Sequence, residues 1–318
     1  MDARAYPPLL KNAHQNSPDP LVVDLIRKTY ALRDGTLSAL HFGNPTEPVR
    51  LVLLHANGFN AQSYRAVLEP LGVHAIAFDM RGHGHSRDLP QPKNMPNWHI
   101  FRDDCIEFFD RHLPKLTDGP VVLSGHSFGA VSAMLAVPFV KDRLSGYVGF
   151  DPVMVPFIFR LTSILPGGRA YMKKRLPIAR NAGRRKSEFE SPEAAFARWQ
   201  GRGAFKAMSD EVLRDYIAGG LIERTDGVWE LACAPKWEQA IFTAQWHNPF
   251  KAAIALPDNS KIIFAGGRVP VSTSGSRADL KKAQPNIDIE FDAELGHLFP
   301  FIQPKLATQV LTKILDAP

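Results

Sequence analysis

The chain has 318 residues, of which 45% are hydrophobic, and a formal net charge of +6. This size and composition allow a large core without disulfides, and the two cysteines, Cys105 and Cys233, lie far apart with no metal-ligand spacing around them. No apolar run reaches the length that spans a bilayer, and no apolar stretch follows the N-terminus as in a secretion signal. We therefore expect a cytoplasmic protein that uses no metal and no cofactor.

The positive charge is concentrated in one stretch. Residues 160–186 contain nine Lys or Arg and no Asp or Glu, so the formal charge of +6 becomes −3 for the rest of the chain. A local excess of this kind does not indicate a nucleic-acid partner.

Short apolar runs alternate with helical patterns in the first half of the chain. Two strands joined at Asp34-Gly35, a two-residue hairpin signal, suggest an antiparallel edge. The runs that follow are continuously apolar, as in a buried parallel sheet. The expected strands are residues 28–33, 36–42, 49–54, 73–78, 121–123 and 145–150, with helices at 61–71, 98–112 and 130–137.

This alternation stops after residue 152. Helix starts with Ser N-caps follow at Ser191-Pro192-Glu193 and at Ser209-Asp210-Glu211, and a third helix is expected at residues 236–246. Strands at 261–265 and 287–291 and helices at 276–283 and 304–315 resume the alternation. We expect a core of residues 1–152 and 257–318, and a helical insert, residues 153–256, which we call the cap segment.

A Gly-x-Ser-x-Gly sequence at residues 125–129 connects the expected fifth strand to a helix. A serine on so sharp a turn is held in strained backbone geometry, and side chains at Gly125 or Gly129 would collide with the neighbouring strand and helix. The turn would also aim the backbone N–H of Phe128 at an oxyanion, together with the positive end of the helix dipole. Ser127 is therefore a candidate nucleophile.

Two further loops follow strands. His-Ala-Asn-Gly at residues 55–58 has either the position of a second oxyanion loop or the composition of an ordinary strand-to-helix turn. Residues 79–86 contain His83 and His85 between glycines, without carboxylates at tetrahedral spacing. That pattern favours a tight loop beside a site over a metal site.

A fourth motif, Gly-His, stands at residues 296–297. With these motifs in this order, the chain resembles the α/β-hydrolase fold superfamily, and in particular its cap-bearing serine hydrolases of esterase or lipase type. The resemblance implies a mostly parallel eight-stranded sheet flanked by helices, with a helical cap inserted after the sixth strand. It also implies Ser127 as nucleophile, His297 as general base, and Asn57 and Phe128 as the residues whose N–H groups form the oxyanion hole. Serine in place of aspartate at the turn disfavours epoxide hydrolases and haloalkane dehalogenases. His126, although adjacent to Ser127, is interpreted as a packed or loop-bonded histidine.

The acid of the triad departs from the commonest pattern of these relatives. The expected strand at 261–265 runs into residues 266–270 without a carboxylate, where the acid usually stands. Some members of the fold carry it one strand earlier, and Asp151 directly follows the strand at 145–150. We therefore expect Asp151 to orient His297, in preference to Asp292, Glu294 or no acid, while a simple turn cap before Pro152 is the alternative role of Asp151.

The residue types predict hydrolysis of a carboxylic ester, with an apolar acyl group, through an acyl-Ser127 intermediate. The expected partner is a small-molecule ester. Alternatives are hydrolysis of a thioester, amide or carbon–carbon bond, peracid formation, or ligand binding without turnover, because the fold hosts all of these.

The first part of the cap segment mixes apolar and basic side chains. Residues 157–165 are rich in Phe, Ile and Leu, and residues 160–186 contain the excess of cations. Such a segment could contact anionic membrane headgroups or could be a solvated basic surface over an apolar acyl pocket. The second interpretation is favoured, because Pro166-Gly167-Gly168 interrupts any long amphipathic helix.

Overall fold

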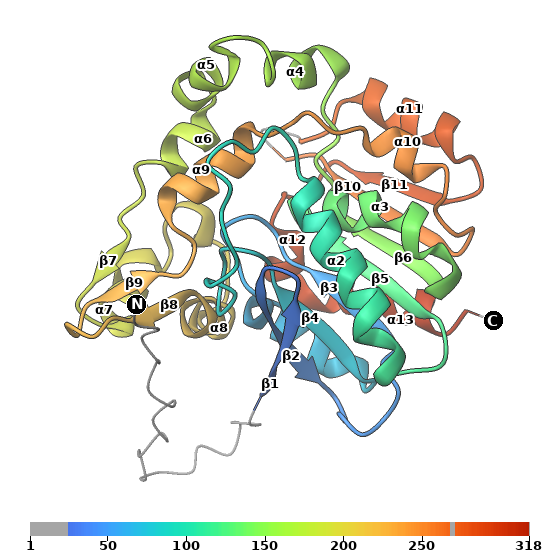
Figure 1. Ribbon diagram of the computed structural model, residues 1–318, viewed down its shortest axis with the longest axis horizontal. Coiled ribbons are helices and arrows are strands. Elements are labelled where there is room, and N and C mark those ends of the chain that lie inside the picture. The colour runs from blue at the N-terminus through green and yellow to red at the C-terminus, as the bar shows by residue number, and fades with distance from the viewer. Residues whose placement is uncertain (1–24, 268–270, 318) are drawn as a thin grey trace, which may run out of the picture.

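The protein is described by a computed structural model that covers residues 25–267 and 271–317. Its centre is an eight-stranded sheet in the order β1-β2-β4-β3-β5-β6-β10-β11, in which only β2 runs antiparallel to its neighbours (Figure 1). This confirms the expected mostly parallel sheet. Its strands are β1 (Ile26–Leu32), β2 (Gly35–Phe42), β3 (Leu51–Leu54), β4 (Ala75–Asp79), β5 (Val121–His126), β6 (Leu144–Phe150), β10 (Ser260–Ala265) and β11 (Asp288–Asp292).

The first hairpin differs from the expectation by one residue. Leu32 pairs with Gly35, so the two-residue turn is Arg33-Asp34 instead of Asp34-Gly35. The carboxylate of Asp34 is used elsewhere, in an ion pair with the buried Arg81. A tertiary contact therefore helps to hold this turn.

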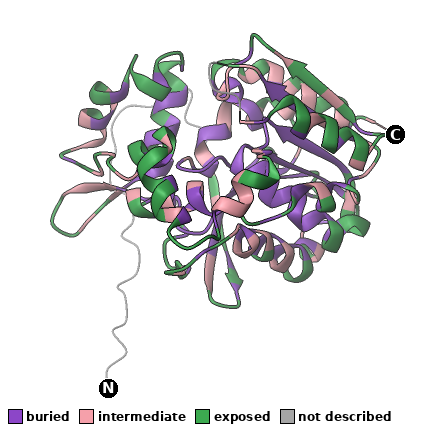
Figure 2. Ribbon diagram, turned by 90° about the horizontal axis from the view of Figure 1, so that it is seen from above, coloured by how far each residue is buried: buried purple, intermediate pink, exposed green. Residues whose placement is uncertain are grey.

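Helices cover both faces of the sheet, because its inner strands are apolar on both sides. In β3, Val52 and Leu54 join one core with α2 and α3, whereas Leu51 and Leu53 join a second core with α1 and α13. Figure 2 shows the buried strands between these layers. The helices are α1 (Arg65–Leu68), α2 (His99–Arg111), α3 (Phe128–Val140), α10 (Pro249–Ala253), α11 (Ser274–Ala283), α12 (Phe299–Ile302) and α13 (Pro304–Leu315), with 3-10 turns η1 (Ala61–Tyr64), η2 (Glu69–Leu71), η3 (Leu113–Lys115) and η4 (Lys141–Arg143).

The elements from α4 to α9, which follow β6, lie at the left and top of Figure 1, whereas α10 lies beside α11. They are α4 (Phe157–Thr162), α5 (Gly168–Arg175), α6 (Pro177–Ala182), β7 (Glu188–Phe189), α7 (Pro192–Trp199), η5 (Gly203–Phe205), α8 (Asp210–Gly220), β8 (Leu221–Glu223), β9 (Trp229–Leu231) and α9 (Pro235–Thr243).

The helix starts expected in the cap segment are confirmed. Ser191 and Ser209 accept hydrogen bonds from the backbone N–H groups of Ala194 and Val212. The cap segment also contains strands that the sequence did not indicate, because β7, β9 and β8 form a small antiparallel sheet. Strands of two or three residues are too short to produce a period-two pattern.

No helix in the described part of the chain is long and apolar enough to cross a membrane. The cytoplasmic location and the division into core and cap stay predictions. Residues 1–24, which the expected core includes, lie outside the described residues.

Candidate active site

Ser127 lies on the turn between β5 and α3, with φ 56° and ψ −116°. A non-glycine residue at positive φ is held there only by its surroundings. One of these restraints is a 2.8 Å hydrogen bond from the backbone N–H of Ser127 to the carbonyl of Phe150, the last residue of β6. The strained turn expected from the sequence is therefore present, and the N-terminus of α3 begins directly beside Ser127.

The two glycines of the turn are required by close packing. A Cβ at Gly125 would lie 2.6 Å from the backbone nitrogen of Ala130. A Cβ at Gly129 would overlap the carbonyl oxygens of Leu54 and His55. The collisions expected from the sequence thus involve the helix for one glycine and the end of β3 for the other.

His297 lies between Ser127 and Asp151. Its Nδ1 is 2.6 Å from Oδ2 of Asp151, and its Nε2 is 2.9 Å from Oγ of Ser127. A carboxylate only accepts hydrogen bonds, so Nδ1 carries the proton and Nε2 is free to accept from the serine hydroxyl. The side chain of His297 is 27% exposed, whereas that of Asp151 is 1% exposed. The structure therefore brings together three residues from separate parts of the chain.

Asp151 is held by the neighbouring strand β10. Its backbone N–H donates to the carbonyl of Ile263 at 2.7 Å, and its Oδ1 accepts from the backbone N–H of Ala265 at 3.1 Å. Its φ is +40°, a strained value for a residue with a side chain. The fixed backbone and the hydrogen bond to Oδ1 leave Oδ2 directed at the histidine.

The other candidate acids have different surroundings. Oδ1 of Asp292 accepts from the backbone N–H of Glu294 at 2.8 Å, which closes a local turn after β11. Within the described part of the chain, neither Asp292 nor Glu294 is hydrogen-bonded to His297. Residues 268–270, where the commonest pattern would have its acid, lie outside the described residues.

The loop after β3 presents a backbone N–H of Asn57 without an acceptor. The next two N–H groups are used, since Gly58 donates to Nε2 of His83 at 3.1 Å and Phe59 donates to a carbonyl within the loop. Among the described residues, the N–H groups of Asn57 and Phe128 have no acceptor. Both residues are buried. The two N–H groups named from the sequence are thus available to bind an oxygen.

Two buried neutral histidines hold this loop against the loop after β4. His55 donates from Nδ1 to the carbonyl of Ala56, and its Nε2 accepts from Met80 at 2.9 Å. His83 faces the carbonyl of Arg81 with Nδ1 and accepts with Nε2. Burial lowers the pKa of His55 to about 4 and that of His83 to about 3. Both rings therefore stay uncharged and serve as fixed donor–acceptor bridges.

A third buried histidine links the same loop to His297. The hydroxyl of Tyr64 accepts from the backbone N–H of Ala56 at 3.0 Å and donates to Nδ1 of His126 at 2.8 Å. Nε2 of His126 donates to the backbone carbonyl of His297 at 2.8 Å. Desolvation holds the pKa of His126 well below its usual value. The interpretation of His126 as a bonded, packed histidine agrees with these contacts.

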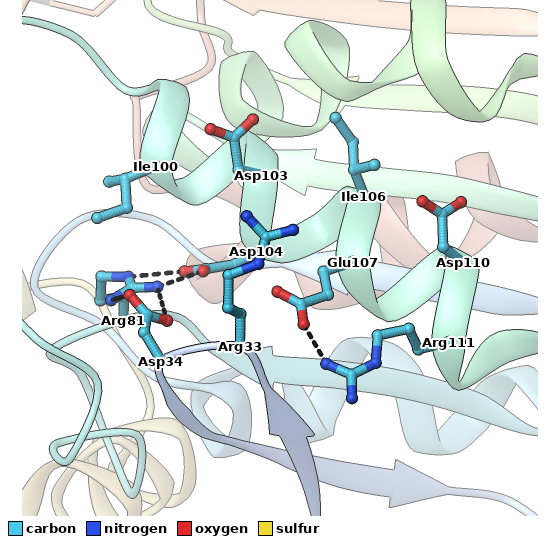
Figure 3. A pocket seen from close by; sticks show the side chains of 10 residues that line it. All are labelled: Arg33, Asp34, Arg81, Ile100, Asp103, Asp104, Ile106, Glu107, Asp110 and Arg111. Carbon is cyan, nitrogen blue, oxygen red and sulfur yellow. Dashed lines mark hydrogen bonds and ion pairs between the residues drawn. The ribbon is translucent and has the colours of Figure 1, made fainter.

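The loop at residues 79–86 is anchored by Arg81. Its guanidinium pairs with Asp34 and Asp104, both at the charged surface hollow drawn in Figure 3. Its carbonyl accepts from the indole N–H of Trp237 at 3.0 Å and from His83. Arg81 thus connects the β1–β2 turn, α2 and α9 to the loop beside the site.

The histidines of this loop do not form a metal site in the described residues, where no cluster of three or more His, Cys, Asp or Glu has metal-binding geometry. The backbone N–H of His85 donates to Asp79, a buried acid that also accepts from Ala61. Hydrogen bonds to Asp79 therefore hold this loop and the start of η1 together.

Sequence reasoning missed two residues beside the site, Tyr64 and Glu238. The backbone carbonyl of Glu238, in α9, accepts from Nδ2 of Asn57 at 3.0 Å, and its carboxylate pairs with Arg185 at 3.2 Å. Tyr64 lies in an expected helix, where an aromatic residue indicates only a core position. Glu238 is 181 residues from Asn57 in the sequence, and no local pattern connects the two.

Comparison with known proteins identifies the family of the chain. A model of the alpha/beta hydrolase family matches residues 51–308. An esterase of Mycobacterium tuberculosis is 37% identical over 117 residues, a stretch that spans 37% of each chain. The match thus covers little more than a third of that relative.

Solved structures are similar over nearly the whole chain. The E-2-(acetamidomethylene)succinate hydrolase has a TM-score of 0.72 at 20% identity, over 92% of this chain and all of that one. A peroxisomal alpha-beta-hydrolase of Saccharomyces cerevisiae has a TM-score of 0.71 at 15% identity, over 96% and 88%. At these identities the likeness shows the fold.

Proposed function

We propose that this chain, which belongs to the alpha/beta hydrolase family, is a serine hydrolase that cleaves carboxylic esters through an acyl-Ser127 intermediate. The observation that carries the proposal is the hydrogen-bonded series from Ser127 through His297 to Asp151, with distances of 2.9 and 2.6 Å. The relative named an esterase supports the choice of an ester bond.

In acylation, Oγ of Ser127 attacks the ester carbonyl while its proton passes to Nε2 of His297. His297 then gives this proton to the departing alkoxide, and the C–O bond to the alcohol breaks. Asp151 keeps Nδ1 protonated and stabilises the transient imidazolium. In deacylation, His297 takes a proton from water, hydroxide adds to the acyl carbonyl, and the proton returns to Ser127.

The negative charge on the carbonyl oxygen needs donors that are already in place. The N–H groups of Asn57 and Phe128 fit this role, because both belong to buried residues and neither has an acceptor among the described residues. The N-terminus of α3 adds a favourable dipole at the same point. Fixed donors cost no reorganisation during the reaction.

The cap segment, residues 153–256, would cover the core formed by residues 1–152 and 257–318. Contacts from α9 support this covering, since the carbonyl of Glu238 accepts from Asn57 and the indole N–H of Trp237 donates to the carbonyl of Arg81. Under this proposal the cap segment closes the site over an apolar acyl group. The proposal also includes a cytoplasmic location for the protein.

The experiment is hydrolysis of 4-nitrophenyl butyrate by the full chain and two serine variants. Ser127→Ala should lower kcat by about 10⁴-fold or more, because the nucleophile and its proton are removed. Ser132→Ala is the matched control, since its Oγ is buried without a partner among the described residues. Hydrolysis of 4-nitrophenyl butyrate by Ser127→Ala at the parental rate would contradict the proposal.

A further inference from the structure

The cap segment carries a basic concavity of about 420 Å³ between the end of α6 and the α7–η5 connection. Five of its nine lining residues are cations and none is acidic. The lining residues are Arg184, Arg185, Lys186, Arg198, Trp199, Arg202, Gly203, Ala204 and Phe205. We call this hollow the basic concavity.

Most of these cations have no anionic partner in the described part of the chain. Arg184, Arg198 and Arg202 are exposed and form no ion pair there. The nearby Arg224, by contrast, pairs with both Glu188 and Asp226. Unneutralised guanidinium groups around one hollow repel one another, which an anionic ligand would relieve.

The floor of the basic concavity is aromatic. Trp199 and Phe205 are each 8% exposed, with ring centroids 5.4 Å apart. The guanidinium of Arg185 lies 5.4 Å from the centroid of Trp199. Planar guanidinium forks around a rigid floor suit the oxygens of phosphate groups, which they bind by paired, charge-assisted hydrogen bonds.

Arg185 connects the basic concavity to the loop after β3. It pairs with the carboxylate of Glu238 at 3.2 Å, and the backbone carbonyl of Glu238 accepts from the side chain of Asn57. Arg185, in the lining of the basic concavity, is therefore two residue contacts away from Asn57, a proposed oxyanion donor.

We propose that the basic concavity binds phosphate groups at the far end of the substrate's leaving group. This inference rests on the proposed hydrolase function. The phosphates take no part in the reaction, and only the acyl bond to the leaving group breaks. The substrate class is then an acyl ester or thioester whose leaving group is a long arm that ends in phosphate.

Binding is tested without turnover, in full-length Ser127→Ala protein titrated calorimetrically with pyrophosphate. Replacing Arg198 and Arg202 together by Gln should weaken binding about a hundredfold, about tenfold for each arginine. The matched control, Arg175→Gln with Arg180→Gln, removes the same charge from exposed positions outside the basic concavity and should bind as the parent does. Absence of binding, or equal loss in both double variants, overturns the proposal.

The source of the phosphate is tested in the active protein with butyryl-coenzyme A and S-butyryl-pantetheine, which differ by the phosphate-bearing end of the leaving group. We expect at least a tenfold lower KM for butyryl-coenzyme A, lost in the Arg198 and Arg202 double variant and kept in the control. Equal KM values overturn the substrate class. Sedimentation with phosphatidic acid vesicles but not with phosphatidylcholine vesicles, combined with equal KM values, would assign the phosphates to a lipid surface and also overturns it.

The two experiments distinguish failure of the proposed hydrolase function from failure of the proposed phosphate site. Pyrophosphate binding that depends on Arg198 and Arg202, in a protein that cleaves neither thioester nor nitrophenyl ester, contradicts the proposed function and leaves the phosphate site standing. Ester cleavage that depends on Ser127, without pyrophosphate binding, contradicts the phosphate site alone.

Discussion

The backbone N–H of Ala265, at the end of β10, donates a 3.1 Å hydrogen bond to Oδ1 of Asp151, which directly follows β6. The carboxylate thus spans two neighbouring strands, and its second oxygen lies 2.6 Å from His297. An acid after β6 thereby reaches the histidine that, in the commonest pattern, an acid after β10 would bind.

Asp151→Asn should lower ester turnover by about four orders of magnitude and leave the thermal midpoint nearly unchanged. Asparagine keeps an oxygen for the N–H of Ala265 and tolerates positive φ, but its amide donates toward Nδ1 and favours the wrong tautomer of His297. Asp292→Asn is the matched control, because Asp292 only closes a turn. Near-parental turnover by the Asp151 variant would mean that another group serves as the acid.

Tyr64→Phe should reduce kcat about tenfold with little change in KM. The substitution leaves the buried N–H of Ala56 without an acceptor and His126 without its donor, at a cost of about 1–3 kcal/mol. Tyr147→Phe is the control, since it removes a buried hydroxyl that donates to Ala130 in α3. If both variants lose stability but keep full kcat, the contacts of Tyr64 are structural only.

Stability should fall as the pH drops from about 6.5 towards 4. His55 and His83 are neutral when folded, because burial lowers their pKa to about 4 and about 3, while unfolded histidine titrates near 6.5. Between these values the unfolded chain binds more protons, so the free energy of unfolding decreases by about 1.4 kcal/mol per pH unit for each such histidine. Above pH 7 this contribution is constant.

Urea unfolding at pH 5, 6, 7 and 8 measures this dependence. His83→Gln should reduce the slope of the free energy of unfolding against pH, between pH 5 and 6, by the equivalent of about one bound proton, because one buried neutral imidazole is removed. An unchanged slope in the variant would show that His83 takes up its proton in the folded state.

Much of the site could be predicted because its residues directly follow strands. The carboxyl ends of parallel strands meet at one edge of a sheet, so Asp151 and Ser127 come together once β5 and β6 pair. The turn around Ser127 could also be recognised from its sequence, because it has no room for a Cβ at Gly125 or Gly129.

Other parts depend on contacts that no local pattern contains. Glu238 reaches Asn57 only when α9 packs on the loop after β3, and the contribution of Tyr64 depends on a hydrogen bond to His126 across the core. The three-residue strands β8 and β9 lack the length for a periodic signal.

Gly129→Ala should destabilise the fold by about 2–4 kcal/mol and lower the yield of active protein. The added Cβ would overlap the carbonyl oxygens of Leu54 and His55, which are backbone atoms that cannot move aside without disturbing β3. Gly119→Ala is the matched control, since the nearest atom to its Cβ would be 3.9 Å away. Equal thermal midpoints for the two variants would contradict this packing.

The most direct test of the acyl-serine mechanism is labelling of the folded chain with a fluorophosphonate, followed by intact-mass measurement and peptide mapping. We expect one adduct per chain, on Ser127, because among the serines in the described part of the chain only this one has a histidine placed to take its proton. His297→Gln should slow labelling at least a thousandfold. A folded chain that stays unlabelled at Ser127 under conditions that label a known serine hydrolase would contradict the mechanism.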